Sequence, residues 1–417
     1  MATIPRPCRI YYADLWGKKA AKLAALDNAT MDTIDWQELH PTEPMLFFTP
    51  KDTAGEEGYV KGFRLDEMMA VNTSGFVTAN DTLNISFTAV EQRDKICELT
   101  TLPEQDWRYK TGRSKDSRDW RYATAKADAL AHDKEPVRVC YRPFDERYTV
   151  YTGNSRGLYS SPQRNVMAHL LQGGNLALCC IRICSRDEDL PVLVTDKITD
   201  KTILSSKDNA NVFPLYLYEE NMGKVEKRVN LDREIVAKIA AAVEGETASV
   251  QQQEEEVRAL EIFDYIYGVL HSPAYRAKFK EFLKSDFPRI PYPKDAAEFA
   301  RYRDAGHELR MVHLMLDPPP PLSEPTARFP VPGDNVVDAV RWDNDRVYIN
   351  PTQYFDNVPL AAYEQAIGGY HPAEKWLKDR KGRALTQDDL RHYQRIILAL
   401  AKTRNVMEGM LHADESA

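Results

Sequence analysis

The feature that most constrains the fold of this chain is a series of β-branched and aromatic runs between residues 137 and 218. The runs are VRVCY, RYTVY, LALCCIRI, PVLVT and FPLYLY, and Gly, Asn, Asp and Pro separate them. β-branched and aromatic residues favour extended strands, and Gly, Asn, Asp and Pro favour turns. This part of the chain therefore predicts a mixed β-sheet.

A polar stretch without aromatic residues, VEGETASVQQQEEE at 243–256, follows the β-rich segment. Such a composition is typical of a linker or a surface excursion. The next segment, EEEVRALEIFDYIYGVL, predicts a helix with acidic residues in its first turn. In HSPAYRAKFKEFLK, Ser272 as N-cap and Pro273 in the first helical position predict the start of another helix.

The end of the chain combines a hairpin pattern with a long helical pattern. VVDAVRWDNDRVYIN, from residue 336, predicts a β-hairpin that turns at Asp343, Asn344 and Asp345. LTQDDLRHYQRIILALAKTRNVM predicts a long final helix, since Thr386 and Asp389 form a pair that resembles a capping box.

These patterns predict an α+β protein of two lobes, a β-rich mixed-sheet lobe followed by a helix-rich lobe with a small β-hairpin. The expected parts are an N-terminal segment at 1–100, a β-rich lobe at 101–242, a linker at about 243–254 and a helix-rich lobe at 255–417. Within the first part, MLFFTP at 45–50 and TLNISFTAV at 82–90 read as strands.

Composition and residue spacing argue against several classes of protein. The formal net charge of -8 disfavours a protein with nucleic acid wrapped around most of its surface. No run approaches the roughly 20 apolar residues of a membrane helix, and the N-terminus lacks a secretory signal pattern. The 6 cysteines form no C-x-x-C pair, and the 9 histidines form no H-E-x-x-H motif. We therefore expect a cytoplasmic protein with no metal site and no membrane partner.

Catalytic motifs are scarce in the sequence. It contains neither G-x-x-x-x-G-K-[ST] nor a strand-adjacent G-x-G for adenosylmethionine. In HLMLDPPPPLSE at 313–324, Asp317 precedes prolines as in amino-methyltransferases, but Pro320 stands where those enzymes place an aromatic residue. We interpret this stretch as a stiff polyproline spacer. The pairs Asp196-Lys197 and Asp200-Lys201 resemble nuclease residues, but charges on solvated loops are the favoured interpretation.

The most basic stretch of the chain, WRYKTGRSKDSRDWRYATAK at 107–126, has seven Lys or Arg residues against two Asp and interleaves them with aromatic residues. Flexible cations of this kind suit the phosphates of DNA. Its lack of apolar periodicity predicts an exposed, extended loop. The alternative is a solvated loop whose tryptophans pack onto the domain. The residues that we predict to bind phosphate are Arg108, Lys110, Arg113, Lys115, Arg118 and Arg121.

Three long motifs resemble the C-terminal region of type ISP and related type IIG restriction-modification enzymes. They are EIFDYIYGVLHSPAYRAKFKEFLKSDFPRIPYP at 261–293, YRPFDERYTVYT with RNVMAHL and NLAL at 141–178, and HPAEKWLKDRKGRALTQDDLRHYQRII at 371–397. YYADLWGKKAAKLAAL and TSGFVTANDTLNISF also resemble the segment downstream of the methyltransferase catalytic motif in that family. The family joins helicase, nuclease and N6-adenine methyltransferase domains to a target-recognition domain.

The resemblance implies that the chain begins just after a methyltransferase domain, which residues 1–100 would adjoin. Arg142 and Arg147, with Asp145, belong to the family motif YRPFDER. A role in the scaffold or in phosphate contact is favoured for them, and base reading stays open. Arg156, Gln163, Arg164 and Asn165 lie in and after a Gly/Ser-rich loop and are predicted to lie near DNA. Sequence-reading residues are expected within 107–126, 153–164 or 205–211.

The resulting hypothesis is a target-recognition domain that positions duplex DNA for base flipping and methylation by a catalytic domain absent from this chain. The partners would be double-stranded DNA and the methyltransferase and helicase-nuclease domains, in cis or in trans. Adenosylmethionine would bind to the methyltransferase domain, and we expect no cofactor and no catalytic residue in this chain. Two alternatives stay open: a stand-alone or degenerate methylase or nuclease, and a protein-interaction remnant of such an enzyme.

Overall fold

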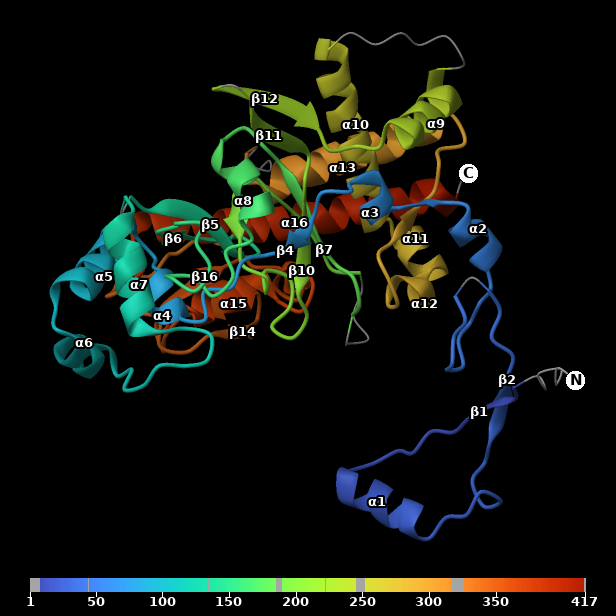
Figure 1. The fold of residues 1–417 in the computed structure, drawn as a ribbon, viewed down its shortest axis with the longest axis horizontal. Coiled ribbons are helices and arrows are strands. Elements are labelled where there is room, and N and C mark those ends of the chain that lie inside the picture. Colours follow the sequence, from blue (N-terminus) through green and yellow to red (C-terminus); the bar gives the residue numbers. More distant parts are fainter. Residues whose placement is uncertain are drawn as a thin grey trace, which may run out of the picture. The chain divides into compact units, whose positions relative to one another are not determined.

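The computed structural model describes residues 8–43, 45–133, 135–184, 190–221, 223–244, 252–316 and 326–415. Most of the expected linker, and the polyproline run with Asp317, lie outside these described residues. The chain divides into two compact units, Met1–Glu56 and Glu57–Ala417. Figure 1 labels the elements of both units.

The N-terminal unit contains a two-stranded sheet and one helix. Strand β1 (Ile10–Tyr12) pairs antiparallel with β2 (Gln37–Leu39), and α1 (Lys19–Asp27) lies between them in the sequence. None of the described residues between 8 and 56 is buried, and Trp16 is 85% exposed. Residues 45–50 form no strand, so that prediction is wrong.

Two sheets form the centre of the second unit (Figure 1). One is antiparallel, with its strands in the order β4 (Thr73–Ser74), β10 (Ala210–Pro214), β7 (Ala177–Ile181) and β8 (Val192–Thr195). The other has the order β6 (Asp145–Thr149), β5 (Val137–Arg142) and β9 (Ile198–Thr199). Because β5 pairs antiparallel with β6 and parallel with β9, the predicted mixed sheet is confirmed. Strands β7 and β8 are buried along their whole length.

The segment before these sheets is helical, against the prediction of a strand at 82–90. It contains α4 (Asp81–Asn84), α5 (Ala89–Thr101), α6 (Glu104–Thr111) and α7 (Tyr122–Ala131). The hydroxyl of Thr88 accepts a hydrogen bond of 3.1 Å from the backbone N–H of Glu91 and so caps α5. The predicted strand is therefore wrong, because the alternation of apolar residues was too short to outweigh this local helix start.

The helix-rich part is built around α10 (Gln252–His271), α13 (Ala296–His313) and α16 (Gln387–Glu415), and α13 packs against both of the others. Two glycines let α10 and α13 approach closely. A Cβ atom at Gly306 would lie 1.8 Å from the carbonyl oxygen of Asp264, and one at Gly268 would lie 2.0 Å from that of Tyr302. No larger side chain fits at either crossing point without moving a backbone.

The predicted hairpin near the end is present and gains a third strand. Strands β14 (Arg341–Asp343), β15 (Arg346–Tyr348) and β16 (Tyr354–Asp356) form one antiparallel sheet. Asn344 and Asp345 connect the first two strands with φ angles of 49° and 57°, as a two-residue type I′ turn requires. The α+β class with a helix-rich second part is therefore confirmed.

The remaining elements lie around these layers. They are α2 (Glu56–Val60), β3 (Phe63–Arg64), α3 (Leu65–Met68), α8 (Arg164–Leu171), β11 (Tyr216–Asn221), β12 (Lys224–Val229), α9 (Arg233–Glu244), α11 (Pro273–Lys278), α12 (Lys280–Leu283), β13 (Arg289–Ile290), α14 (Leu360–Tyr363) and α15 (Pro372–Lys378). Pairing of β3 with β13 and of β4 with β10 joins regions far apart in sequence. The predicted division at about residues 100 and 243–254 stays a prediction. Across the described residues, the helices are all too short or too polar to cross a membrane.

Candidate nucleic-acid interface

The basic and aromatic segment at 107–126 contains a loop between two helices. Residues 112–121 connect α6 to α7 without regular secondary structure and are mostly exposed, whereas Trp107, Trp120 and Tyr122 are buried. The ring centroids of the two tryptophans lie 5.8 Å apart in a stacked arrangement. The predicted exposed loop is therefore confirmed for residues 112–121 but wrong for 107–111 and 122–126, which belong to helices, because three large rings are buried at these helix ends. The alternative, in which the tryptophans pack onto the domain, is confirmed.

Three cations of this segment, Arg108, Lys110 and Arg118, form ion pairs with acidic residues. Arg108 lies 2.6 Å from Asp116 and 2.7 Å from Glu104, and Lys110 lies 2.6 Å from Glu98. Arg118 pairs with the adjacent Asp119, and the guanidinium of Arg113 lies 4.6 Å from the centroid of the Trp120 ring. Two further cations, Lys115 and Arg121, are exposed and form no ion pair within the described part of the chain.

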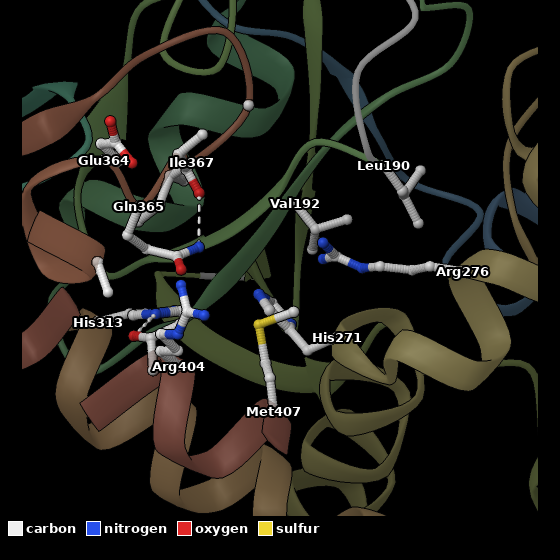
Figure 2. A pocket seen from close by; sticks show the side chains of 14 residues that line it. Leu190, Val192, His271, Arg276, His313, Glu364, Gln365, Ile367, Arg404 and Met407 are labelled. Carbon is white, nitrogen blue, oxygen red and sulfur yellow. Dashed lines mark hydrogen bonds between the residues drawn. The ribbon is translucent and has the colours of Figure 1, made fainter. Parts of the chain in front are cut away.

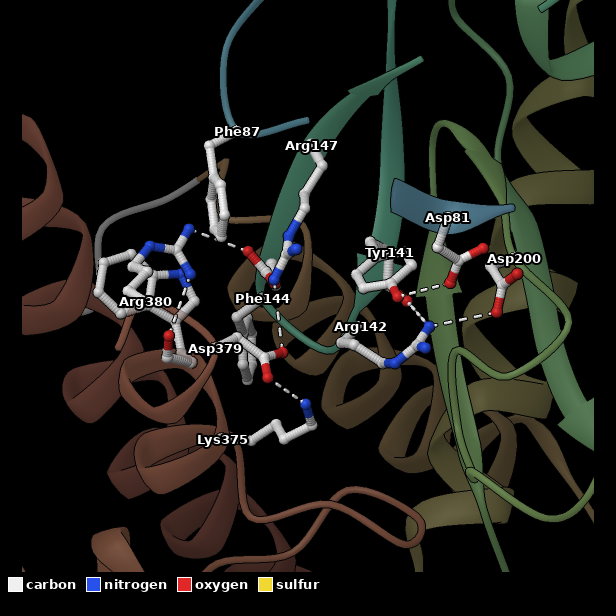
Figure 3. A network of polar contacts seen from close by, with 12 residues as sticks. Asp81, Phe87, Tyr141, Arg142, Phe144, Arg147, Asp200, Lys375, Asp379 and Arg380 are labelled. Carbon is white, nitrogen blue, oxygen red and sulfur yellow. Dashed lines mark hydrogen bonds and ion pairs between the residues drawn. The ribbon is translucent and has the colours of Figure 1, made fainter. Parts of the chain in front are cut away.

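The motif YRPFDER forms part of a buried ionic network (Figure 3). Asp145, only 1% exposed, accepts hydrogen bonds from Arg147 at 2.6 Å and from Arg380 at 3.0 Å. Burial by itself would raise the pKa of Asp145, but the two guanidinium groups outweigh burial and hold the pKa below its usual value. Arg147 also contacts Asp379 of the segment after α15 at 3.4 Å. This network ties the hairpin of β5 and β6 to a region more than two hundred residues later.

Arg142 lies in the same part of the fold, with different partners (Figure 3). Its guanidinium pairs with Asp200 at 3.2 Å and lies 3.8 Å from the ring centroid of Tyr141. The hydroxyl of Tyr141 donates to Asp81 at 2.8 Å. Arg142 and Arg147 thus occupy buried ion pairs, which is the arrangement of a scaffold, and their contact with DNA stays a prediction.

The loop between β6 and α8 is held by a single carboxylate. Asp128, on α7 and 8% exposed, accepts hydrogen bonds from Thr152 at 2.8 Å, from Asn154 at 2.9 Å and from the backbone N–H of Leu158 at 2.8 Å. A Cβ atom on Gly157 would lie 2.1 Å from the same carboxylate. Only glycine therefore fits next to this carboxylate. We refer to the loop at 150–163, which Asp128 holds in a fixed shape, as the clamped loop.

Gln163 fixes the other end of the loop. Its side-chain carbonyl accepts a hydrogen bond of 3.1 Å from Thr73, and its amide donates one of 3.0 Å to Ser74, both in β4. Gln163 has a φ of 57° and immediately precedes α8. This side chain therefore anchors the loop to the sheet, and its predicted contact with DNA stays a prediction.

The remaining three predicted residues of this region are exposed. Arg156 lies at the tip of the clamped loop, and Arg164 and Asn165 lie in the first turn of α8. A Cβ atom on Gly153 would lie 3.3 Å from the aliphatic Cδ of Arg164, so this side chain runs beside the loop. The first turn of α8 contains no acidic residue, and its backbone N–H groups favour an anion. These three residues are thus exposed polar or positively charged side chains on the loop held by Asp128 and on the helix that follows it.

Sequence reasoning missed the residues that build this support. Asp128 lies in a helical segment without a motif, and Thr73 and Arg380 lie in motifs that gave no indication of these contacts. All three meet the loop or the hairpin only in the folded chain. Gly157 carried a signal, since it is the glycine of the polar run NSRG within the predicted loop. The sequence pattern could not indicate that a Cβ atom at this position would lie 2.1 Å from the carboxylate of Asp128.

Three of the four charges that resemble nuclease residues, Asp196, Lys197 and Asp200, are paired with other side chains. Lys197 lies 2.6 Å from Asp196 and 2.9 Å from Glu146, and Asp200 pairs with Arg142. Within the described ranges, no three His, Cys, Asp or Glu side chains are grouped as metal ligands.

Comparison with known proteins gives one family. Residues 67–409 match the family model of the Type ISP C-terminal specificity domain. No curated protein matches the chain. The resemblance of the three long motifs to type ISP enzymes is thereby confirmed.

Solved structures with a similar fold belong to much longer chains. A nuclease-deletion mutant of the Type ISP restriction-modification enzyme LlaGI, in complex with a DNA substrate mimic, matches with a TM-score of 0.65 and 20% identity over 96% of this chain and 33% of that chain. The DrdV–DNA complex, determined by cryo-electron microscopy, matches with a TM-score of 0.69 and 20% identity over 96% of this chain and 43% of that chain. The ATP-dependent Type ISP restriction-modification enzyme LlaBIII bound to DNA matches with a TM-score of 0.65 and 18% identity over 96% of this chain and 27% of that chain.

At these identities the three structures show a shared fold, and this chain spans less than half of the length of each. The family model, in contrast, matches well over half of this chain. This chain therefore belongs to the family of Type ISP C-terminal specificity domains.

Proposed function

We propose that this chain is the sequence-specific DNA-recognition region of an adenine-methylating restriction-modification enzyme. It would hold duplex DNA and position one adenine for flipping and methylation by a catalytic domain outside this chain. The observation that carries the proposal is the match of residues 67–409 to the specificity-domain family. Each of the three similar enzymes was determined with DNA or a DNA mimic, which supports the same partner here.

The clamped loop and the start of α8 are the proposed contact surface. Arg156 and Arg164 would bind phosphates, because both are exposed cations on a support fixed by Asp128 and Gln163. Asn165 presents an amide, the group that pairs with the edge of adenine in the major groove. Lys115 and Arg121 would add phosphate contacts from the turn between α6 and α7.

The other domains of the parent enzyme would perform the chemistry. Adenosylmethionine would be bound by the methyltransferase domain, in cis or in trans, and would supply the methyl group there. Helicase-nuclease domains would carry out restriction. Because DNA is the proposed partner, we expect this activity in the bacterial cytoplasm, as part of a defence system.

The salt dependence of DNA binding tests the proposed surface. Affinity for a labelled duplex of mixed sequence should fall steeply with salt concentration, because each phosphate contact releases condensed counterions. The double variant Arg156→Ala/Arg164→Ala should lower the slope of log K against log salt by about 0.9 for each lost contact. Fluorescence anisotropy at several salt concentrations measures both slopes.

A matched double variant controls for the loss of two charges. Arg341 and Arg391 are exposed arginines on β14 and α16, and their replacement by alanine should leave the slope unchanged. Equal slopes for wild type and Arg156→Ala/Arg164→Ala would show that this surface does not contact DNA. Specific recognition further requires that the wild-type chain enrich one sequence from a random duplex pool. Tight adenosylmethionine binding by this chain alone would contradict the proposal that the methyltransferase domain, outside this chain, binds the cofactor.

A further inference from the structure

The N-terminal unit has no core among its described residues. None of those between 8 and 56 is buried. Its regular structure consists of the three-residue strands β1 and β2 and the nine-residue helix α1. A two-stranded sheet by itself is at best marginally stable in water, and isolated helices shorter than about 12–15 residues are marginal as well. The unit therefore needs a surface outside itself to stabilise its structure.

Large hydrophobic side chains of this unit are exposed. Trp16 is 85% exposed, Met31 is 73% exposed and Phe48 is 63% exposed. Leu23 and Leu26, both on α1, are 50% and 48% exposed. One exposed apolar side chain is ordinary, but several on one small unit are typical of a protein interaction site. Burial of these side chains against a partner would remove a large apolar area from water.

Helix α1 carries cations on the side that bears its leucines. Lys19 precedes Leu23 by four residues and Lys22 precedes Leu26 by four, so these side chains share one face of the helix. Neither lysine forms an ion pair with a described residue. The helix begins without a side-chain cap and without an acid in its first turn, where the helix dipole disfavours cations. An acidic surface opposite this face would offset that repulsion.

In the described part of the second unit, exposed apolar side chains and concave surface do not match this face of α1. Exposed large hydrophobic residues there are spread over different elements, as Val90 on α5 and Val225 on β12 illustrate. Figure 2 shows a pocket of about 360 Å³ whose lining contains Arg276 and Arg404, with Glu364 as its acidic residue. Such a lining does not supply acidic groups for two lysines.

The similar solved structures indicate that the partner is another domain of the same enzyme. Their matches each cover 96% of this chain, and the uncovered 4% is shorter than the unit Met1–Glu56. Part of this unit therefore has a counterpart of similar fold in those enzymes, although the specificity-domain family model begins only at residue 67. This fold covers less than half of each longer chain, so those chains contain further protein on which the counterpart can pack.

We propose that the N-terminal unit docks on the methyltransferase domain of the parent enzyme, at a surface that is apolar in its centre and acidic at its edge. Trp16, Leu23 and Leu26 would fill the apolar part, and Lys19 and Lys22 would pair with the acidic groups. The stretch YYADLWGKKAAKLAAL, which includes most of α1, resembles the segment next to that domain in the family and supports this choice. This docking rests on the proposed function, since it requires a catalytic domain outside this chain.

Hydrogen exchange measured on two samples tests the docking. In this chain alone, the backbone amides of α1 should exchange much faster than those of the buried strand β7. In the assembled parent enzyme, with the methyltransferase domain in cis or in trans, exchange of α1 should slow by about tenfold or more. A photoreactive phenylalanine analogue in place of Trp16 should crosslink to the methyltransferase domain and so identify the partner.

Variants of the parent enzyme separate the apolar and the charged contribution. Trp16→Ala/Leu23→Ala should remove most of the protection of α1 and slow methyl transfer by about tenfold or more, because large apolar anchors dominate such interfaces. Lys19→Glu/Lys22→Glu should also weaken the protection, since it places acids against an acidic edge. The matched control Val225→Ala/Val257→Ala removes exposed apolar side chains from β12 and α10 and should leave the protection unchanged.

Three results would overturn the proposal. Fast exchange of α1 in the parent enzyme would mean that the methyltransferase domain does not cover it. Protection of α1 in the dilute chain alone would place its partner within this chain, and protection that grows with chain concentration would indicate a second copy.

DNA binding by this chain distinguishes this proposal from the proposed function. Trp16→Ala/Leu23→Ala should leave the affinity for duplex DNA and its salt slope unchanged, because neither residue belongs to the proposed DNA surface. Loss of docking with intact DNA recognition would reject the docking alone. Intact docking without DNA recognition would support the docking and reject the proposed DNA surface.

Discussion

Two pairs of arginines, close in sequence, have opposite surroundings. Arg142 and Arg147 are largely buried on β5 and β6, where Asp200 and Asp145 neutralise them. Arg156 is exposed on the loop between β6 and α8, and Arg164 is exposed in the first turn of α8; the nearby carboxylate, Asp128 of α7, holds uncharged donors of that loop. The difference teaches that the position of a carboxylate decides whether an arginine belongs to the scaffold or is available to an outside partner.

The largest expected effect comes from removing the acid of the buried network. Asp145→Asn should reduce the free energy of unfolding by about 3–5 kcal/mol, because two buried guanidinium groups would lose their anion. Urea unfolding followed by circular dichroism measures this difference. The matched change Asp343→Asn, at an exposed pair with Arg341, should cost about 0–1 kcal/mol. Equal costs for the two changes would remove the contrast between buried and exposed pairs.

Acid should weaken the same network without a mutation. The pKa of Asp145 is lower in the folded chain than its ordinary value of 3.8. Its contribution to stability is therefore complete above about pH 3.8 and is lost as the pH falls through the folded pKa. The difference in unfolding free energy between wild type and Asp145→Asn should shrink from neutral pH to about pH 3. A difference that is constant over this range would mean that Asp145 is not the titrating group.

A methyl group under the loop clamp should have an intermediate effect. Gly157→Ala places a Cβ atom 2.1 Å from the carboxylate of Asp128, so loop or carboxylate must move. We expect a loss of about 1–3 kcal/mol in unfolding free energy and a lower affinity for duplex DNA. Gly409→Ala, at a helical position with open space around it, is the control and should leave DNA binding unchanged. Full DNA affinity in Gly157→Ala would show that the loop shape does not matter.

The smallest expected effect on stability comes from the exposed arginines. Arg156→Ala/Arg164→Ala should change the free energy of unfolding by less than about 0.5 kcal/mol, since neither side chain forms an ion pair with a described residue. Thermal unfolding of this variant beside Asp145→Asn measures the contrast directly. A loss as large as that of Asp145→Asn would mean that the exposed arginines also belong to the scaffold.

Local patterns predicted much of the fold. The five β-branched runs each overlap at least one strand, Ser272 caps α11 with Pro273 in its first turn, and Asn344 and Asp345 form the turn of the final hairpin. These features depend on residues a few positions apart, and such interactions are visible in a single chain. The strand predicted at 82–90 was wrong because the capping hydrogen bond of Thr88 favoured a helix start.

The candidate interface was only partly predictable. The sequence indicated exposed cations at Arg156 and Arg164, because a polar loop with glycine and serine carries them. It did not distinguish these from Arg142, Arg147 or Arg108, since all are arginines near aromatic or turn residues. Their acidic partners could not be assigned from spacing, and some lie far away along the chain, as Asp200 and Asp379 do.

The sequence by itself determined the α+β class, the strand-rich segment at 137–218, the helix-rich second part and, through three long motifs, the family to which the chain belongs. Only the tertiary structure decided which arginines are neutralised and which loop Asp128 holds in place. The physical reason is that strand and helix preferences arise from neighbouring residues, whereas charge pairing and burial depend on side chains that meet only when distant segments pack together.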